Sequence, residues 1–208
     1  MTGTASPIVF IIDDDAGMRA AIQGLVKTVG LRAESFATPQ DFFRRNPSGG
    51  PSCLVLDVRL PEIGGLDVQR KLADAGVKIP IIFITGHGDI PMSVKAMKSG
   101  AVEFLTKPFR HQDLLDAIQL ALQRDRESQL EQEQIADLQK RYRTLTARER
   151  EVMGLVVSGM RNKEIASELG TSEITVKVHR GQVMHKMEAA SVGELGRMAE
   201  KLKLPPTK

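Results

Sequence analysis

The sequence predicts an α/β doubly wound domain with a five-stranded parallel sheet, joined by a long helix to an all-α domain of four helices. Three observations support this fold class. Short apolar runs alternate with amphipathic helical patterns over residues 8–105, as expected for a parallel sheet covered on both faces. Residues 111–145 contain neither proline nor glycine. Capping residues and glycines then divide residues 146–202 into short helical segments.

The composition is that of an ordinary globular protein with room for two small domains. Its 208 residues are 41% hydrophobic and 26% charged. The net charge of +3 is unevenly distributed, because residues 1–142 carry 17 Lys/Arg against 18 Asp/Glu and residues 143–208 carry 12 against 8. A basic C-terminal segment suggests nucleic acid as a partner, although a solvated surface explains the same charge equally well.

The sequence also predicts a cytoplasmic protein without a membrane partner. No stretch approaches the roughly 18 consecutive apolar residues of a membrane span, and the N-terminus lacks the pattern of a secretion signal. The single cysteine, Cys53, cannot form an internal disulfide and opens an apolar strand. It is therefore expected to be a small core residue in a reducing compartment.

The elements of the first domain follow from apolar runs and helical spacing. Strands are expected at 8–12, 31–35, 53–56, 81–84 and 102–105. Helices are expected at 18–29, 39–46, 66–74 and 91–99, the first of them ended by Gly30.

Polar residues stand at the ends of four of these strands, namely Asp13, Asp14 and Asp15, then Asp57, Thr85 and Lys107. Parallel strands end at one edge of the sheet, where open α/β folds place their chemistry. Several carboxylates brought together there need a cation, and hard oxygen ligands favour Mg²⁺. Lys107 would pair with a carboxylate or a phosphoryl oxygen, and Thr85 supplies a small donor.

The competing interpretation is that these acids only cap the following helices, as Asp commonly does. For Asp15 we favour that interpretation. For Asp57 we reject it, because residues 58–61 (VRLP) do not open a helix directly.

These residues resemble a response-regulator receiver domain over roughly residues 6–125. The resemblance is carried by DDD after the first strand and by DVRLPEIGG, ITGHGD and FLTKPF. It implies that Asp57 accepts a phosphoryl group from a phosphohistidine on a sensor histidine kinase. It also implies that Mg²⁺ is held by Asp13, Asp14, Asp57 and the backbone carbonyl of Arg59.

The same resemblance assigns Lys107 and Thr85 as the groups that sense the phosphoryl charge, with Phe104 at the aromatic switch position. Phe104 lacks the tyrosine hydroxyl found there in relatives, so coupling at this position is expected to be weaker or purely steric. Residues 85–92 (TGHGDIPM) resemble the FixJ-type regulators, in which this segment and the fifth strand form a dimer face. His87 alone does not support a metal or pH-switch site, because no second ligand is in view.

Residues 111–145 are expected to form one helix. Leu114, Leu115, Ile118 and Leu122 give it a face that closes the first domain. Further on, Ile135, Leu138, Tyr142 and Leu145 form an apolar stripe of helical period, which Leu130 does not join. The alternative is a charged, partly disordered tether.

Four capped helices are expected in the basic segment. Thr146 and Glu149 form a capping box before an inner face of Val152, Leu155 and Val156. Asn162 is expected to cap a helix at 163–169, with Ile165, Ala166 and Leu169 inward. Ser172 should cap a third helix at 173–187, and the last spans 192–202.

The second and third of these helices form a helix-turn-helix, whose second helix enters the major groove of DNA. On that recognition helix Ile174, Val183, Met187 and, in part, Val176 are expected to pack inward. Thr175, Lys177, Val178, Gly181, Gln182 and His185 then face outward, where Lys, Gln and Val can contact guanine, adenine and a thymine methyl. Phosphate contacts are expected from Lys163, His179 and Arg180.

The run LTARERE…NKEIASELGTSEITVKVHRGQVMHKM resembles the LuxR/NarL-type DNA-binding domain over about residues 142–205. Gly181 departs from it, since many relatives carry a basic residue there. Glycine costs roughly 1 kcal/mol of helix stability relative to alanine, which suggests close approach of a backbone. The alternative is a four-helix protein-interaction module.

The sequence therefore predicts a phosphorylation-dependent, DNA-binding transcriptional regulator rather than an enzyme. Its parts are a receiver at 6–122, a linker helix at 123–142 and a DNA-binding domain at 143–208. Expected partners are a sensor histidine kinase, double-stranded promoter DNA, RNA polymerase and a second copy of the chain, and the expected outcome is activation of transcription.

Two other classes compete with this prediction. A dehalogenase-type phosphatase would carry a second acid two residues after its nucleophile, where this chain has Arg59. An RNA-binding regulator is disfavoured by the helix-turn-helix.

Overall fold

The computed structural model describes residues 6–45, 49–86 and 90–204. The chain forms two compact units, one ending at Gln129 and the other beginning at Leu130.

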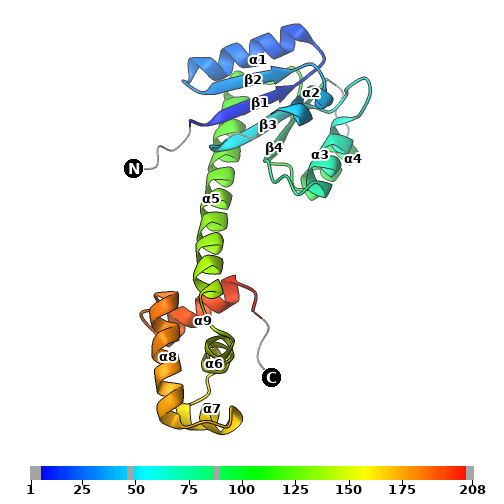
Figure 1. Cartoon of the computed structure of the whole chain (residues 1–208). Coiled ribbons are helices and arrows are strands. Elements are labelled where there is room, and N and C mark those ends of the chain that lie inside the picture. Colours follow the sequence, from blue (N-terminus) through cyan, green and yellow to red (C-terminus); the bar gives the residue numbers. More distant parts are fainter. Residues whose placement is uncertain (1–5, 46–48, 87–89, 205–208) are drawn as a thin grey trace. The chain divides into compact units, whose positions relative to one another are not determined.

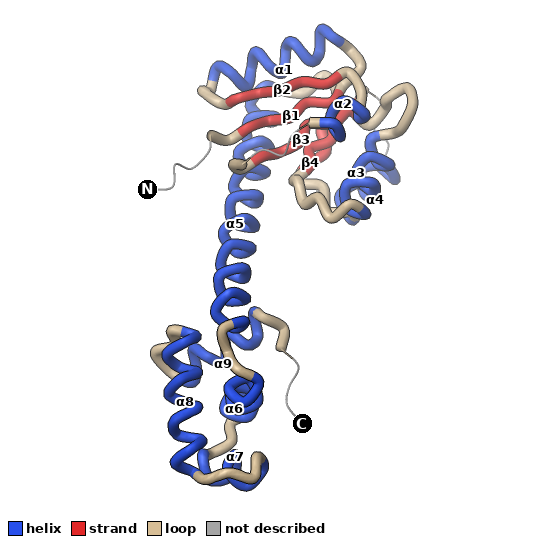
Figure 2. The backbone as a smooth tube through the Cα atoms, viewed as in Figure 1, coloured by secondary structure: helices blue, strands red, loops and turns tan. Residues whose placement is uncertain are grey.

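The first unit is a five-stranded parallel sheet with helices on both faces (Figures 1 and 2). Its strands are β1 (Ile8–Ile12), β2 (Arg32–Phe36), β3 (Ser52–Asp57), β4 (Ile81–Thr85) and β5 (Glu103–Thr106). Its helices are α1 (Ala16–Thr28), α2 (Pro39–Arg44), α3 (Gly65–Asp74), α4 (Ile90–Lys98) and the first part of α5 (His111–Arg143). The strand order is β2-β1-β3-β4-β5, which confirms the doubly wound fold.

Two apolar layers sandwich this sheet. Alternate residues of β1 belong to opposite layers, Phe10 to one and Ile11 to the other. The layer containing Phe10 packs against α2, α3 and α4, and the layer containing Ile11 packs against α1 and α5. Cys53 is fully buried in the second layer, as expected. Both faces of the central strands are therefore covered, which explains their unbroken apolar sequence.

The second unit combines the end of α5 with four helices, α6 (Ala147–Val157), α7 (Asn162–Glu168), α8 (Glu173–Met187) and α9 (Val192–Lys201). The capping box of Thr146 and Glu149 and the Ser172 cap are both present. The predicted apolar stripe is confirmed in part: Leu138 is buried, Tyr142 packs with the core of this unit, and Ile135 is half-buried. Leu145 is buried in the same core but lies beyond the end of α5, which stops at Arg143. Leu130 is exposed, so it stands outside the stripe as expected.

Helix α5 is continuous from His111 to Arg143, which excludes the disordered tether for this segment. Its first turns close the sheet through Leu114, Ile118 and Leu122. Among the described residues, no helix combines the length and apolarity needed to cross a membrane.

Two predictions about helix faces and caps are wrong. Ile174 does not pack inward: it is 77% exposed, while Val176 is completely buried. The inner face of α8 is set by Val176, Val183 and Met187, and Ile174 lies on the opposite side of the helix. Asn162 is the first residue of α7, whose cap position is occupied by Arg161. The Asn162 side chain instead accepts a hydrogen bond from Arg180 at 2.8 Å.

Candidate functional site

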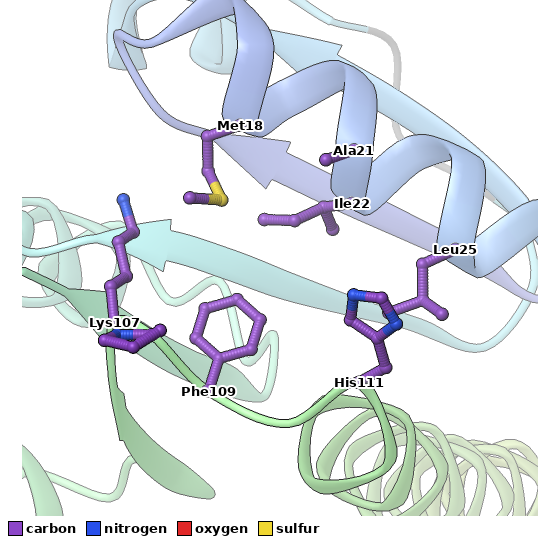
Figure 3. A pocket seen from close by; sticks show the side chains of 8 residues that line it. Met18, Ala21, Ile22, Leu25, Lys107, Phe109 and His111 are labelled. Carbon is purple, nitrogen blue, oxygen red and sulfur yellow. The ribbon is translucent and has the colours of Figure 1, made fainter.

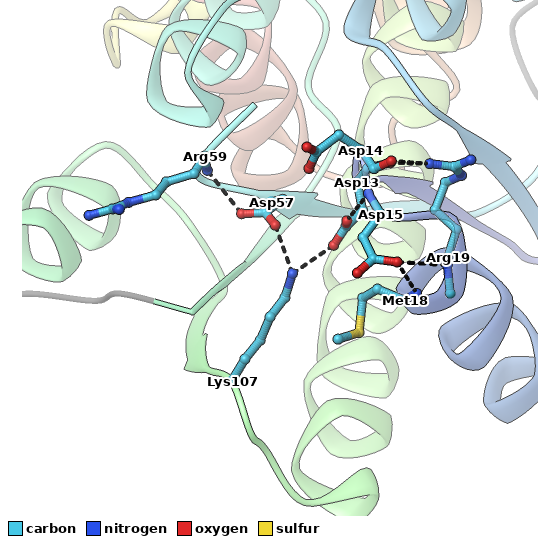
Figure 4. A network of polar contacts seen from close by, with 9 residues as sticks. Asp13, Asp14, Asp15, Met18, Arg19, Asp57, Arg59 and Lys107 are labelled. Atoms are coloured by element: carbon cyan, nitrogen blue, oxygen red, sulfur yellow. Dashed lines mark hydrogen bonds and ion pairs between the residues drawn. The ribbon is translucent and has the colours of Figure 1, made fainter. Parts of the chain in front are cut away.

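The carboxyl-terminal edge of the sheet brings together the acids and the lysine singled out from the sequence. Lys107, which follows β5, donates hydrogen bonds to Asp13 Oδ2 and Asp57 Oδ2, both at 2.7 Å. Figure 4 shows its ammonium group between the two carboxylates. Asp13 is completely buried and Asp57 nearly so. One cation thus bridges the ends of β1 and β3.

Backbone groups fix the remaining carboxylate oxygens. Asp57 Oδ1 accepts from the Arg59 amide at 2.9 Å, and Asp13 Oδ1 accepts from the Asp15 amide at 2.8 Å. Asp15 itself caps α1, accepting from the amides of Gly17 and Met18, which confirms the capping interpretation for that residue. The positions of both buried acids are therefore set by the turns that follow their strands.

The loop after β3 turns back tightly onto the strand that carries Asp57. The Gly65 amide donates to the Val58 carbonyl at 2.8 Å. A Cβ at position 65 would lie 2.5 Å from the Asp57 carbonyl oxygen. Only glycine fits there without moving the backbone of the candidate phosphoacceptor.

Thr85 and Lys107 are joined by a hydrogen bond between their backbones. Thr85 ends β4 and is completely buried. Its carbonyl accepts a hydrogen bond from the Lys107 amide at 2.7 Å, which holds the end of β4 beside the segment that follows β5.

The site carries more negative than positive charge. Asp13, Asp14 and Asp57 place carboxylate oxygens within 4.8 Å of one another, and Asp14 is exposed. Burial raises the pKa of Asp13, although its bond with Lys107 acts in the opposite direction. Burial by itself lowers the pKa of Lys107, but the bonds to Asp13 and Asp57 outweigh it and the pKa is raised. Oxygen ligands grouped in this way suit a divalent cation such as Mg²⁺.

Two other predicted residues lie near this cluster but make different contacts. The Arg59 amide contacts Asp57, as described, and its side chain is exposed. Phe104 is half-buried, with its ring centroid 6.3 Å from that of Phe83, and it packs on the layer that contacts α4. His87 lies outside the described residues.

A pocket of about 200 Å³ adjoins the acidic cluster. Figure 3 shows α1 on one side of it and the segment from Lys107 to His111 on the other. Its lining is mainly apolar and is formed by Met18, Ala21, Ile22, Leu25, Lys107, Pro108, Phe109 and His111. No signal in the sequence grouped these residues in advance.

The predicted DNA-contacting residues lie on or beside α8. Thr175, Lys177, Val178, Gly181, Gln182 and His185 are exposed, as is Lys163 on α7. His179 and Arg180 are half-buried, and the Arg180 guanidinium holds Asn162. Most of the predicted contact residues are therefore available on one helix.

The burial and the long-range partners of two carboxylates were not predicted from the sequence. Glu149 accepts from Lys186 at 2.7 and 2.8 Å and from the Thr146 amide at 2.7 Å. Asp125, on α5, accepts from the Ser52 amide at the start of β3, also at 2.7 Å. Capping chemistry identified Glu149 but not its lysine, and no local signal identified Asp125.

Comparisons with known proteins agree with this architecture. Residues 9–119 match the response regulator receiver domain, and residues 143–199 match the luxR family of bacterial regulatory proteins. The chain therefore belongs to the response regulators of two-component systems that combine a receiver with a LuxR-type DNA-binding domain, and it is a transcriptional regulator of the FixJ type. A receiver implies a histidine kinase as partner, and the LuxR-type domain implies DNA binding.

Curated relatives match along nearly the whole chain. Nodulation protein W of Bradyrhizobium diazoefficiens is 51% identical over 195 residues, covering 94% of this chain and 86% of that protein. Response regulator protein TmoT of Ectopseudomonas mendocina is 48% identical, covering 94% and 89%. FixJ of Rhizobium meliloti is 39% identical, covering 92% and 94%.

Solved structures show the same two-domain family. The response regulator StyR superposes with a TM-score of 0.82 at 43% identity, covering 95% of this chain and all of that one. Full-length FixJ from B. japonicum gives a TM-score of 0.56 at 35% identity, covering 97% and 99%.

Proposed function

We propose that this regulator is switched by phosphorylation of Asp57 and that the switch controls promoter binding by the C-terminal domain. The observation that carries the proposal is Lys107, whose ammonium lies 2.7 Å from both Asp13 and Asp57. A single cation shared by two buried acids is able to move onto a new anionic group attached to one of them.

Phosphoryl transfer depends mainly on positioning and on neutralising charge at the transferred oxygens. The Asp57 carboxylate supplies the attacking oxygen, and the N–P bond of the kinase phosphohistidine breaks. Asp13, Asp14 and Asp57, with the Arg59 carbonyl, would hold Mg²⁺, which neutralises the phosphoryl oxygens when bound.

The added negative charge then attracts the donor groups at the neighbouring strand ends. Lys107 exchanges its bond to Asp57 for a phosphoryl oxygen, and the Thr85 hydroxyl donates to another. Because Lys107 and Thr85 are joined through the backbone, the loops after β4 and β5 respond together. Phe104, packed between this edge and α4, senses the change by steric contact.

The apolar pocket beside Lys107 is proposed as part of the surface that receives the kinase. A phosphodonor protein has to cover this edge to reach Asp57, and apolar surface rimmed by polar groups is typical of interaction sites. Met18, Leu25 and Phe109 supply that surface.

The output is proposed to be activation of transcription through α8 and its flanks, with RNA polymerase as a further partner. Receiver residues 6–122, linker residues 123–142 and DNA-binding residues 143–208 form the functional divisions. Dimerisation on phosphorylation or on DNA doubles the binding unit and multiplies its effective affinity.

The test is to incubate the full chain with Mg²⁺ and a small phosphodonor and to locate the modification by mass spectrometry. Sustained, acid-stable labelling of Asp57 is expected, absent from Asp57→Asn and unchanged in Asp74→Asn, which alters an exposed acid on α3. A gel shift on promoter fragments should strengthen on labelling. Rapid turnover of many phosphoesters would instead indicate a phosphatase, and failure to shift any DNA would contradict the output.

A further inference from the structure

Ile174 is an unusual residue for an exposed helix surface. It is the second residue of α8 and is 77% exposed, and Val178, one turn further on, is 58% exposed. The other apolar side chains of the helix, Val176, Val183 and Met187, are completely buried, and Met184 is half-buried. Helix α8 therefore places two branched apolar side chains in solvent, and the core of the unit forms without them.

Both exposed residues lie on the side of α8 opposite the core. With 3.6 residues per turn, Ile174 and Val178 point within about 40° of each other and lie roughly 6 Å apart along the axis. Gly181 continues the same face, and a Cβ added there would meet no atom within 4 Å. The packing of the unit thus does not require glycine at 181, and the face beyond the apolar pair is left open.

The charges around this face favour a polyanion as its occupant. Helix α8 carries one acid, Glu173, against Lys177 and Arg180, while its third cation, Lys186, is paired with Glu149. Lys163 is exposed on the preceding helix. In a helix-turn-helix the N-terminal residues of the second helix contact base edges, and Ile174 occupies such a position. The apolar group that a base edge presents in the major groove is the thymine C5-methyl.

We propose that Ile174 is a specificity-determining residue that contacts a thymine methyl in the major groove, one or two base pairs from the methyl contacted by Val178. The inference rests on the proposed DNA-binding function and extends it to a sequence preference. The operator half-site should therefore contain two nearby thymines whose recognition depends on methyl groups rather than hydrogen bonds.

The experiment first selects duplexes from a random-sequence library with the phosphodonor-treated full chain. Affinities are then measured for the selected duplex with each thymine replaced singly by deoxyuridine, which removes only the methyl. The wild-type chain should lose about fourfold in affinity at each of two positions, the factor for one buried methyl-sized group.

Single substitutions assign each position to its residue. The affinity of Ile174→Ala should not change when deoxyuridine replaces thymine at one of the two positions, and it should still fall about fourfold at the other. Val178→Ala should show the reverse pattern. Leu130→Ala, at an exposed apolar site on α5, should behave as wild type. Because Ile174 is exposed, its alanine variant should show unchanged circular dichroism.

Two failures are distinguishable. If the wild-type chain selects no duplex, the proposed DNA binding is wrong and this inference falls with it. If a duplex is selected but Ile174→Ala keeps the full pattern of deoxyuridine effects, DNA binding stands and the inference is overturned.

Discussion

Each unit of this protein holds a lysine against buried carboxylates, but the charges balance in only one of them. Lys186 donates to both oxygens of Glu149, and the same carboxylate accepts the Thr146 amide at the start of α6. Lys107 is instead shared by Asp13 and Asp57, with Asp14 exposed beside them. One lysine pairs with one acid in the second unit, whereas in the first unit one lysine is shared by two acids and a third acid lies close to them.

The difference separates a structural ion pair from a site prepared for a ligand. A buried pair whose partners are all satisfied contributes to one fixed arrangement. A cluster with unbalanced negative charge instead offers oxygen ligands that could hold a further cation. Charge balance, rather than burial, distinguishes these two sites, and four predictions test that distinction.

The largest effect is expected from Mg²⁺. At a hundredfold excess over its Kd, Mg²⁺ should stabilise the first unit by about 2.7 kcal/mol and leave the second unit unchanged. Calorimetry measures both transitions, and fluorescence of Tyr142, the single tyrosine, assigns the second, because Tyr142 packs on that core. Asp14→Asn should weaken the shift, whereas Asp41→Asn, on the surface of α2, should preserve it. Equal stabilisation of both units would contradict the comparison.

Truncating each lysine should reveal a second difference in behaviour between the two sites. Lys186→Met leaves Glu149 buried without its cation and should destabilise the second unit by about 1–3 kcal/mol, with or without Mg²⁺. Lys107→Met should destabilise the first unit only in the absence of Mg²⁺, because the ion then replaces the missing charge. Chemical denaturation with and without Mg²⁺ measures both effects. Rescue of Lys186→Met by the ion would show that the two sites are equivalent.

A smaller effect is expected from neutralising acids on α6. Glu149→Gln keeps an oxygen for the Thr146 amide but loses the ion pair, which should cost about 1 kcal/mol of stability. Glu151→Gln removes a surface pair with Arg148 and should change stability by less than about 0.5 kcal/mol. Tyr142 fluorescence during denaturation compares the variants directly. Equal losses would mean that burial of Glu149 adds nothing.

The smallest effects are expected from pH, with opposite signs in the two units. Hydrogen bonds from Lys186 hold the pKa of Glu149 below its ordinary value of 4.5, so its contribution is present above pH 4.5 and is lost as the pH falls through the lowered pKa. Burial raises the pKa of Asp125 above its ordinary value of 3.8, so its contribution is present below pH 3.8 and is lost as the pH rises through the raised pKa.

Two variants isolate these contributions. Glu149→Gln should approach wild-type stability as the pH is lowered below 4.5. Asp125→Asn keeps an oxygen for the Ser52 amide without burying a charge. Its stability should therefore increase relative to that of the wild type as the pH rises above 3.8. Unfolding titrations across this range measure both trends. The same sign for both variants would refute the assignment.

Much of the fold was predictable because its signals are local. Strand β1 was predicted with its observed ends, and α8 with its ends and its Ser172 cap, since apolar runs and capping residues act over a few positions. The strand-end acids and Lys107 were predicted for the same reason, because parallel strands place their ends at one edge.

The errors arose where a residue's surroundings come from elsewhere in the chain. Ile174 was assigned inward because it is apolar, although the spacing of Val176, Val183 and Met187 already places it on the opposite face. Asn162 was assigned as a cap, but Arg180, 18 residues away, uses its side chain. Asp125 stands in a polar run, yet it is buried and accepts a hydrogen bond from the amide of Ser52, 73 residues away. Spacing corrects the first error, whereas the other two depend on tertiary contacts.

The buried position of Cys53 has a practical consequence for studying how the two units communicate. Its thiol is completely enclosed in the sheet layer, and burial raises the pKa of the thiol further, so it should resist modification in the folded chain. Cysteines introduced at exposed positions such as Lys71 and Lys140 would then be the reactive ones. A fluorophore pair attached there would follow the separation of the units in solution as Asp57 is labelled, without first removing a native cysteine.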